Sequence, residues 1–223
     1  MADRALFAGR SFAALLFDMD GTLLSSIEAA ERIWSRWAVR HGLDVEAFLP
    51  TIHGVRAVDT IRRLGLPGVD PEKEAAELTE AEMDDMGGIK PIPGAPAFLA
   101  ALPANRWAIV TSAPHALARR RLAAAGLPLP EVLIAAEDVA RGKPLPDCYH
   151  LAASHLGVTA ADCAVFEDAP AGIAAGEASG AAVAVIAATH LEPMATPHPL
   201  IEHYDEIVVR LDAAQRIHLA ARD

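Results

Sequence analysis

Seven polar side chains lie at or shortly after the ends of four apolar runs in this sequence. In chain order they are Asp18 and Asp20, Thr111 and Ser112, Lys143, and Glu167 and Asp168. Short apolar runs of this kind are typical of buried strands in a parallel sheet. Ligands of such sheets bind outside the carboxyl ends of the strands. We therefore expect these acids, hydroxyls and the lysine to converge on one crevice.

This combination of groups suits hydrolysis of a phosphate monoester, a reaction that enzymes accelerate by up to about 21 powers of ten. Asp18 would be ionised at neutral pH. Electrostatic repulsion opposes its attack on the phosphate anion: two unit charges about 4 Å apart at an effective dielectric of about 20 repel each other by about 4 kcal/mol. Asp18 and Asp168 offer the oxygen ligands that Mg²⁺ prefers. Lys143 adds a compact positive charge, and the Thr111 hydroxyl can donate to a phosphoryl oxygen.

Asp18 and Asp20 are two residues apart, so on an extended chain both side chains point the same way. One could attack phosphorus while the other protonates the leaving oxygen and later takes a proton from water. Alone, the pair could be a turn and a helix cap, and Thr111 a helix N-cap. The presence of all four groups in order favours the catalytic interpretation.

The elements that would position these groups alternate between strand and helix. Strands are expected at 12–18, 107–112, 132–136, 163–168 and 181–187, with a weaker candidate at 206–209. Helices are expected at 115–125, 147–156 and 169–178, each closely followed by a glycine, as helix ends often are. This alternation predicts a doubly wound α/β fold with a Rossmann-like parallel sheet.

Residues 23–89 break the alternation, because they contain no convincing strand. Helical spacing of apolar residues predicts helices at 27–41, 55–64 and 71–86 instead. We therefore predict an α/β core formed by 1–22 and 92–223, with a helical unit of 23–91 inserted after the first strand.

Composition limits the classes of partner. The 223 residues carry a formal net charge of −11, which argues against binding to nucleic acid or to an anionic membrane. The two cysteines, Cys148 and Cys163, form no disulfide framework and suit a reducing compartment. No apolar run is long enough to span a bilayer. We expect a cytoplasmic protein and a monomer.

Four segments resemble the motifs of the haloacid dehalogenase superfamily, in order and over essentially the whole chain. They are DMDGTL at 18–23, TS at 111–112, GKP at 142–144 and EDAPAG at 167–172. The resemblance implies a nucleophile at Asp18 and an acid/base at Asp20. It implies phosphoryl binding by Thr111, Ser112 and Lys143. The implied Mg²⁺ ligands are Asp18, Asp168 and the main-chain carbonyl of Asp20, whereas the role of Glu167 stays open.

The resemblance also bears on the substrate. Members that remove halogen lack the second acid of the first motif, so Asp20 implies phosphoryl transfer. The helical insertion resembles the small α-helical cap, and HGVRAVDT at 53–60 is similar to a cap motif of 2-deoxyglucose-6-phosphate and glycerol-3-phosphate phosphatases. A hexose, pentose or polyol phosphate is therefore the implied substrate. His53 and Arg56 would contact it, although His53 could simply pack in the cap and Arg56 could pair with Asp59.

Three other functions remain open at this stage. A phosphomutase of the β-phosphoglucomutase type would use the same two aspartates. A response-regulator receiver also holds an aspartyl-phosphate, but such domains are shorter and lack the helical insertion. A silent binding protein on the same scaffold would not need the complete set of chemical groups.

Overall fold

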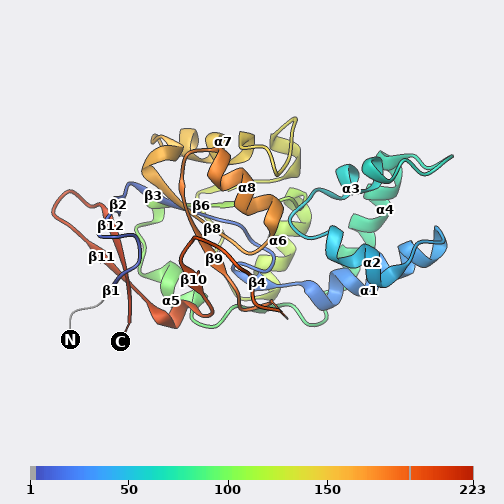
Figure 1. The fold of residues 1–223 in the computed structure, drawn as a ribbon. Helices are drawn as coiled ribbons and strands as arrows, with labels where there is room; N and C mark the ends of the chain where they lie inside the picture. Colours follow the sequence, from blue (N-terminus) through green and yellow to red (C-terminus); the bar gives the residue numbers. More distant parts are fainter. Residues whose placement is uncertain (1–3, 191, 223) are drawn as a thin grey trace.

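The core of the protein is a six-stranded parallel sheet (Figure 1), seen in a computed structural model that describes residues 4–190 and 192–222. The strand order across the sheet is β10-β9-β8-β3-β6-β7. In chain order the strands are β3 (Ala14–Phe17), β6 (Trp107–Val110), β7 (Val132–Ile134), β8 (Cys163–Glu167), β9 (Ala182–Ile186) and β10 (Leu200–Ile201). Every neighbouring pair runs parallel. The predicted doubly wound α/β class is confirmed.

Alternation along β3 divides the core into two apolar layers. Ala14 and Leu16 belong to one cluster of buried side chains, and Leu15 and Phe17 belong to the other, because successive side chains of a strand point to opposite faces. Helices α7 (Asp147–His155) and α8 (Pro170–Ala178) cover the first face, and α5 (Ala95–Ala100) and α6 (His115–Ala124) cover the second (Figure 1).

A second, antiparallel sheet packs against the α5 side of the core. It contains β1 (Arg4–Ala5), β2 (Ser11–Phe12), β11 (Ile207–Leu211) and β12 (Ile217–Ala221). The weak strand candidate at 206–209 corresponds to β11, which pairs antiparallel with β12 and so lies outside the parallel sheet. Burial decreases along β11, from the buried Ile207 to the exposed Arg210 and Leu211.

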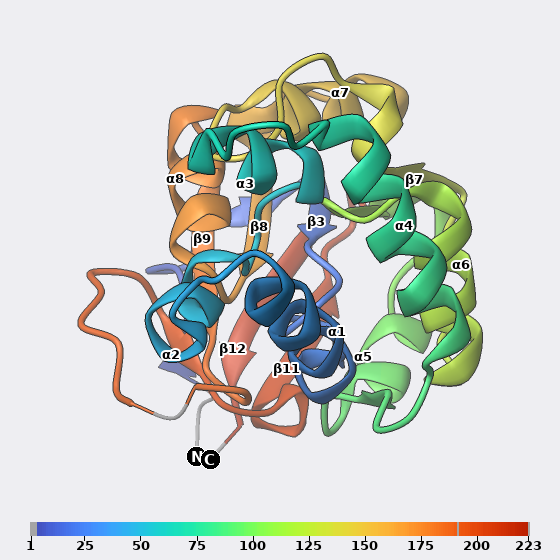
Figure 2. The same cartoon turned by 90° about the vertical axis from the view of Figure 1, so that its right-hand side faces the viewer.

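Four α-helices and one short 3-10 helix (Leu49–Thr51) lie within residues 23–91, and we refer to the four α-helices as the cap helices. They are α1 (Ile27–Arg40), α2 (Val45–Phe48), α3 (Ala57–Leu64) and α4 (Pro71–Asp84). They surround an apolar cluster of their own, in which the rings of Trp34 and Trp37 meet edge to face at 5.6 Å. Figure 2 views the molecule from the side on which these helices cover the core. The short helix α2 had no counterpart in the sequence prediction.

The chain leaves and re-enters the core through two short antiparallel strands, β4 (Leu24–Ser25) and β5 (Lys90–Pro91). The expectation that 23–89 holds no strand is therefore wrong at β4, whose two residues are too few to show a period. The division into 1–22 with 92–223, and 23–91, stays a prediction, and residues 1–3, 191 and 223 lie outside the described residues. No helix within the described parts of the chain is long and apolar enough to cross a membrane.

Candidate active site

The three central strands deliver their terminal polar residues to one place. Asp18 follows β3, Thr111 follows β6 and Asp168 follows β8, and β3 pairs with both of the other strands. The backbone N–H of Asp18 donates to the carbonyl of Phe166 at 2.9 Å, which continues the ladder to the first acid. All three side chains are buried. The structure thus brings together the groups that the sequence places at strand ends.

Lys143 joins this group from the loop after β7. Its Nζ lies 2.5 Å from Asp18 Oδ1, 2.7 Å from Glu167 Oε1 and 3.0 Å from the carbonyl oxygen of Val110. These contacts use the three N–H donors of the ammonium group. Burial would lower the pKa of Lys143, but the Asp18 and Glu167 carboxylates outweigh burial and raise that pKa. Lys143 is therefore charged and touches the proposed nucleophile directly.

Glu167, whose role the sequence left open, holds Lys143. Its Oε1 accepts from Lys143 and, at 2.7 Å, from the hydroxyl of Tyr149, and its Oε2 accepts from the backbone N–H of Asp168 at 3.1 Å. Gly172 makes room for this carboxylate, because a Cβ at that position would lie 1.7 Å from Glu167 Oε1. Both oxygens of Glu167 thus already have protein donors.

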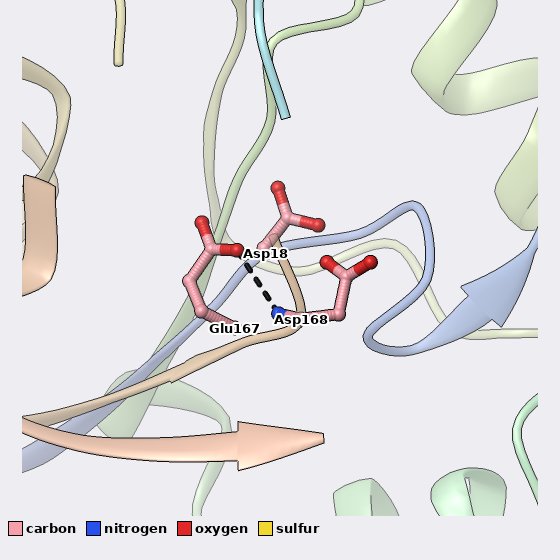
Figure 3. Close-up of side chains that lie close together, drawn as sticks. All are labelled: Asp18, Glu167 and Asp168. Carbon is pink, nitrogen blue, oxygen red and sulfur yellow. Dashed lines mark hydrogen bonds between the residues drawn. The ribbon is translucent and has the colours of Figure 1, made fainter. Parts of the chain in front are cut away.

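Asp18, Glu167 and Asp168 form a cluster of carboxylates that fits a divalent cation (Figure 3). One oxygen of each lies within 4.8 Å of the others. Burial and the neighbouring Glu167 raise the pKa of Asp18 to about 8, although Lys143 opposes the rise. Burial and Asp18 likewise raise the pKa of Asp168 well above its usual value. Without a cation these shifts favour the protonated acids at neutral pH, contrary to the expectation that Asp18 is ionised. A divalent cation would lower both pKa values and so favour the carboxylate of Asp18.

Asp20 is fixed by two donors on the same oxygen. Ser26 Oγ donates to Asp20 Oδ1 at 2.6 Å, and Arg121 NH1 donates to the same atom at 3.0 Å. The other guanidinium nitrogen, NH2, lies 3.3 Å from Glu82 Oε1 on the cap helix α4. Burial raises the pKa of the Glu82 carboxyl, and Arg121 opposes that rise. Asp20 is thereby linked through Arg121 to the cap.

A cavity of about 90 Å³ lies between the core residues and the cap helices. Asp18, Asp20, Thr111, Ser112 and Asp168 line its core side. Thr111 Oγ1 accepts from the backbone N–H of Ala113 at 3.0 Å, which leaves the hydroxyl proton to be donated. The volume is below the roughly 300 Å³ at which ordinary ligand pockets begin. A sugar phosphate would therefore need more room than the cavity offers in this arrangement of the cap helices.

The loop before α3 carries the residues predicted to contact substrate from the cap. His53 lines the cavity, and burial lowers its pKa. Arg56 does not line the cavity: its Nε donates to Asp59 at 2.6 Å, and its terminal nitrogens donate to the carbonyls of Val139 at 2.9 Å and Ala140 at 3.1 Å. The structure thus brings His53 to the site but directs Arg56 to the loop that precedes Lys143.

Close packing holds the loop before α3, residues 52–56, to the core, and we call this segment the cap loop. Ser112 Oγ donates to the carbonyl of Gly54 at 2.9 Å. Gly54 has φ +73°, and a Cβ there would lie 2.7 Å from the Cβ of Ala169. A side chain at position 54 would thus separate the cap loop from the segment that carries Asp168.

Residues 12–180 match the family model of the haloacid dehalogenase-like hydrolases. The chain belongs to this family. Among its relatives, hexitol phosphatase A of Escherichia coli is 44% identical over 194 residues, covering 84% of this chain and 89% of that protein. Glycerol-1-phosphate phosphohydrolase 2 of Saccharomyces cerevisiae is 36% identical, covering 79% and 75%.

A solved structure extends the comparison. It is a mutant of the protein CbbY from Rhodobacter sphaeroides in complex with xylulose-(1,5)bisphosphate, with a TM-score of 0.72 and 25% identity, covering 87% of this chain and 96% of that one. The family predicted from the four motifs is confirmed, and the named relatives include sugar and polyol phosphatases.

Several residues of the site escaped the sequence analysis, among them Ser26, Tyr149, Arg121 and Glu82. Arg121 lies one turn after Leu117 on α6, and Glu82 lies one turn after Leu78 on α4; both leucines are buried. Residues four apart share a helix face, so a charged residue in register with a buried leucine was the available signal.

Proposed function

We propose that this protein hydrolyses small sugar or polyol phosphates in a Mg²⁺-dependent reaction, with Asp18 as the nucleophile. The observation that carries the proposal is the environment of Asp18, which is buried, lies 2.5 Å from Lys143 Nζ and faces a cavity shared with Asp20, Thr111 and Asp168. The phosphatases among the relatives supply the substrate class.

Mg²⁺ would be held by Asp18, Asp168 and the main-chain carbonyl of Asp20. When bound, the ion would offset negative charge on the phosphoryl oxygens and on the acids. Thr22 Oγ1 donates to Asp168 Oδ1 at 3.2 Å, which orients this ligand.

The chemistry follows from the two aspartates. A carboxylate oxygen of Asp18 forms a bond to phosphorus while the bond from phosphorus to the ester oxygen breaks, and Asp20 gives that oxygen a proton. Asp20 then takes a proton from water, whose oxygen attacks the aspartyl-phosphate and frees inorganic phosphate and Asp18. Because Ser26 and Arg121 both donate to Oδ1, we assign the proton to Oδ2 of Asp20.

Binding of the phosphoryl group falls to Thr111, Ser112 and Lys143. Lys143 acts mainly through its charge, since its donors already have partners, and the Ser112 hydroxyl would have to release the carbonyl of Gly54 to donate to the phosphoryl group. His53 is suited to contact the substrate from the cap. Arg56 would have to exchange its carbonyl partners to do so, and we assign it instead to holding the closed cap against the core.

The cysteines bear on the compartment in which the protein works. Cys148 and Cys163 are both buried free thiols, which suits the reducing cytoplasm. We propose a cytoplasmic enzyme that acts as a monomer on small phosphorylated molecules, with no nucleic acid or membrane partner.

The test is phosphate release from a panel of sugar and polyol phosphates, with Mg²⁺ and with chelator, for wild type and Asp18→Asn. Release that depends on Mg²⁺ and disappears in the variant supports the proposal. Conversion of glucose 1-phosphate to glucose 6-phosphate without phosphate release would favour the phosphomutase. Release by Asp18→Asn at the wild-type rate would refute the assigned nucleophile.

A further inference from the structure

An ion pair between a cap helix and a core helix lines the cavity, and the proposed chemistry uses only the contact of its arginine with Asp20. Glu82 of α4 and Arg121 of α6 line the cavity, and their side chains approach to 3.3 Å. Glu82 is 8% exposed and Arg121 is 5% exposed. The pair therefore lies in the wall where the part of the substrate beyond its phosphate must fit.

One of the donors of Arg121 has no partner in the part of the chain that the structure describes. NH1 donates to Asp20 and NH2 faces Glu82, whereas Nε is buried without a partner among the described residues. A buried N–H without an acceptor is unfavourable and rare in folded proteins, so each case needs an explanation. The nitrogen is closed off from the cavity, so an acceptor on the substrate would satisfy it once the Arg121 side chain shifts toward the cavity.

The charge of the cavity wall argues against a second anionic group on the substrate. Among the described residues that line the cavity, Arg121 is the only lysine or arginine, and it already lies between the carboxylates of Asp20 and Glu82. Arg56, the next candidate, donates to Asp59 and to backbone carbonyls. A second phosphate or a carboxylate would thus meet Glu82 without a free cation to balance it.

Neutral hydroxyl groups match the same wall. A hydroxyl donates one hydrogen bond and accepts others, so it can donate to Glu82 and accept from Arg121. Ser26 and Thr79 also line the cavity. Their hydroxyl protons are donated to Asp20 and to the carbonyl of Ala75, so each oxygen can only accept from a ligand. A chain of carbons that each carry a hydroxyl would find donors and acceptors along its length.

Building on the proposed phosphatase activity, we propose that Glu82 and Arg121 are specificity-determining residues that select a neutral, hydroxyl-bearing group beside the phosphate. Arg121 donates to its hydroxyls, Glu82 accepts from them, and the Glu82 carboxylate repels substrates with a second anionic group. Such repulsion is one of the two ways in which a site discriminates between ligands. The expected preference is opposite to that of a site built for a bisphosphate.

The wild-type enzyme with Mg²⁺ provides the first test. We would measure kcat/KM for glucitol 6-phosphate, for glucitol 1,6-bisphosphate and for hexyl phosphate, which has the same carbon count and no hydroxyls. The latter two are each expected to be poorer by about tenfold or more, since a site built for hydroxyls rejects analogues that lack them. Equal values for the bisphosphate or for hexyl phosphate would overturn the inference.

Glu82→Gln provides the second test, because it removes the charge and keeps the size. The ratio of kcat/KM for bisphosphate over monophosphate should rise by about tenfold, which corresponds to about 1.4 kcal/mol. Glu80→Gln is the matched control, since Glu80 is exposed on the same helix, and it should leave the ratio unchanged. The same ratio in both variants would overturn the role of Glu82.

The two proposals fail in different ways. Phosphate release from the monophosphate without discrimination leaves the phosphatase standing and removes the specificity inference. No release from any of the three substrates overturns both. If Glu82→Gln does not fold, as judged by its circular dichroism, the wild-type ratios still decide the question.

Discussion

Replacement of Glu167 by glutamine is expected to slow catalysis by disturbing Lys143. Glu167 Oε1 accepts from Lys143 Nζ and from Tyr149, and Oε2 accepts from the backbone N–H of Asp168. Hydrogen bonds to charged groups contribute about 1.5–3 kcal/mol, and neutral ones are about half as strong. A glutamine would keep one acceptor, so the bond to Lys143 weakens by about 1 kcal/mol.

The second carboxylate oxygen adds a larger loss. The glutamine NH₂ would face the N–H of Asp168, which leaves a buried donor unsatisfied at a cost of about 1–3 kcal/mol. Together the changes amount to about 2–4 kcal/mol. If they act in the transition state, kcat/KM falls by about 30- to 1,000-fold, at 1.36 kcal/mol per factor of ten.

Phosphate release across a series of Mg²⁺ concentrations distinguishes positioning from metal binding. Glu167→Gln should lower the rate at saturating Mg²⁺ and leave the half-saturating concentration unchanged. Asp168→Asn, the comparison variant, should raise the half-saturating concentration. If Glu167→Gln instead recovers the wild-type rate at high Mg²⁺, then Glu167 is a metal ligand and the reasoning is wrong.

Three further predictions concern the cap and the metal. Gly54→Ala should lower kcat/KM much more than the control Gly65→Ala does. Both glycines have positive φ and share a backbone cost of about 1 kcal/mol, but only a side chain at position 54 would meet the core. Equal kcat/KM values in the two variants would contradict this. Arg56→Ala should reduce kcat/KM by a similar factor for every substrate, because loss of cap closure would affect all of them. The control Arg62→Ala should have little effect, since the ion pairs of Arg62 are exposed. A loss confined to one substrate would instead indicate that Arg56 contacts that substrate directly. Mg²⁺ at about 100 times its Kd should stabilise the fold by about 2.7 kcal/mol, which raises the Tm measured by calorimetry by about 5–10 °C. Asp168→Asn should abolish this shift in Tm. An equal shift in that variant would place the ion elsewhere.

The strand-end residues could be predicted from the sequence because their positions depend on local pattern. Asp18 and Asp168 each end an apolar run, and parallel strands place such ends together. The sheet membership of 206–209 could not be predicted in this way, because a short apolar run does not specify the strand with which it pairs.

Contacts between residues far apart in the chain could not be predicted from the sequence either. Lys143 was expected at the site, but its hydrogen bond to Glu167 depends on how the loop after β7 packs against β8. Arg121 reaches Asp20 across 101 positions, and Arg56 reaches the loop at 139–140. Such pairings depend on the orientation of whole helices, which a single sequence pattern does not determine.

The most direct test of the account is detection of the phosphoryl group on Asp18. Wild-type protein would be mixed with glucitol 6-phosphate and Mg²⁺, quenched in acid within the first turnover and digested for mass spectrometry. We predict a phosphoryl group on Asp18 of the wild type, and neither this group nor phosphate release in Asp18→Asn. Turnover by Asp18→Asn, or a phosphoryl group carried by another residue of the wild type, would contradict the central claim.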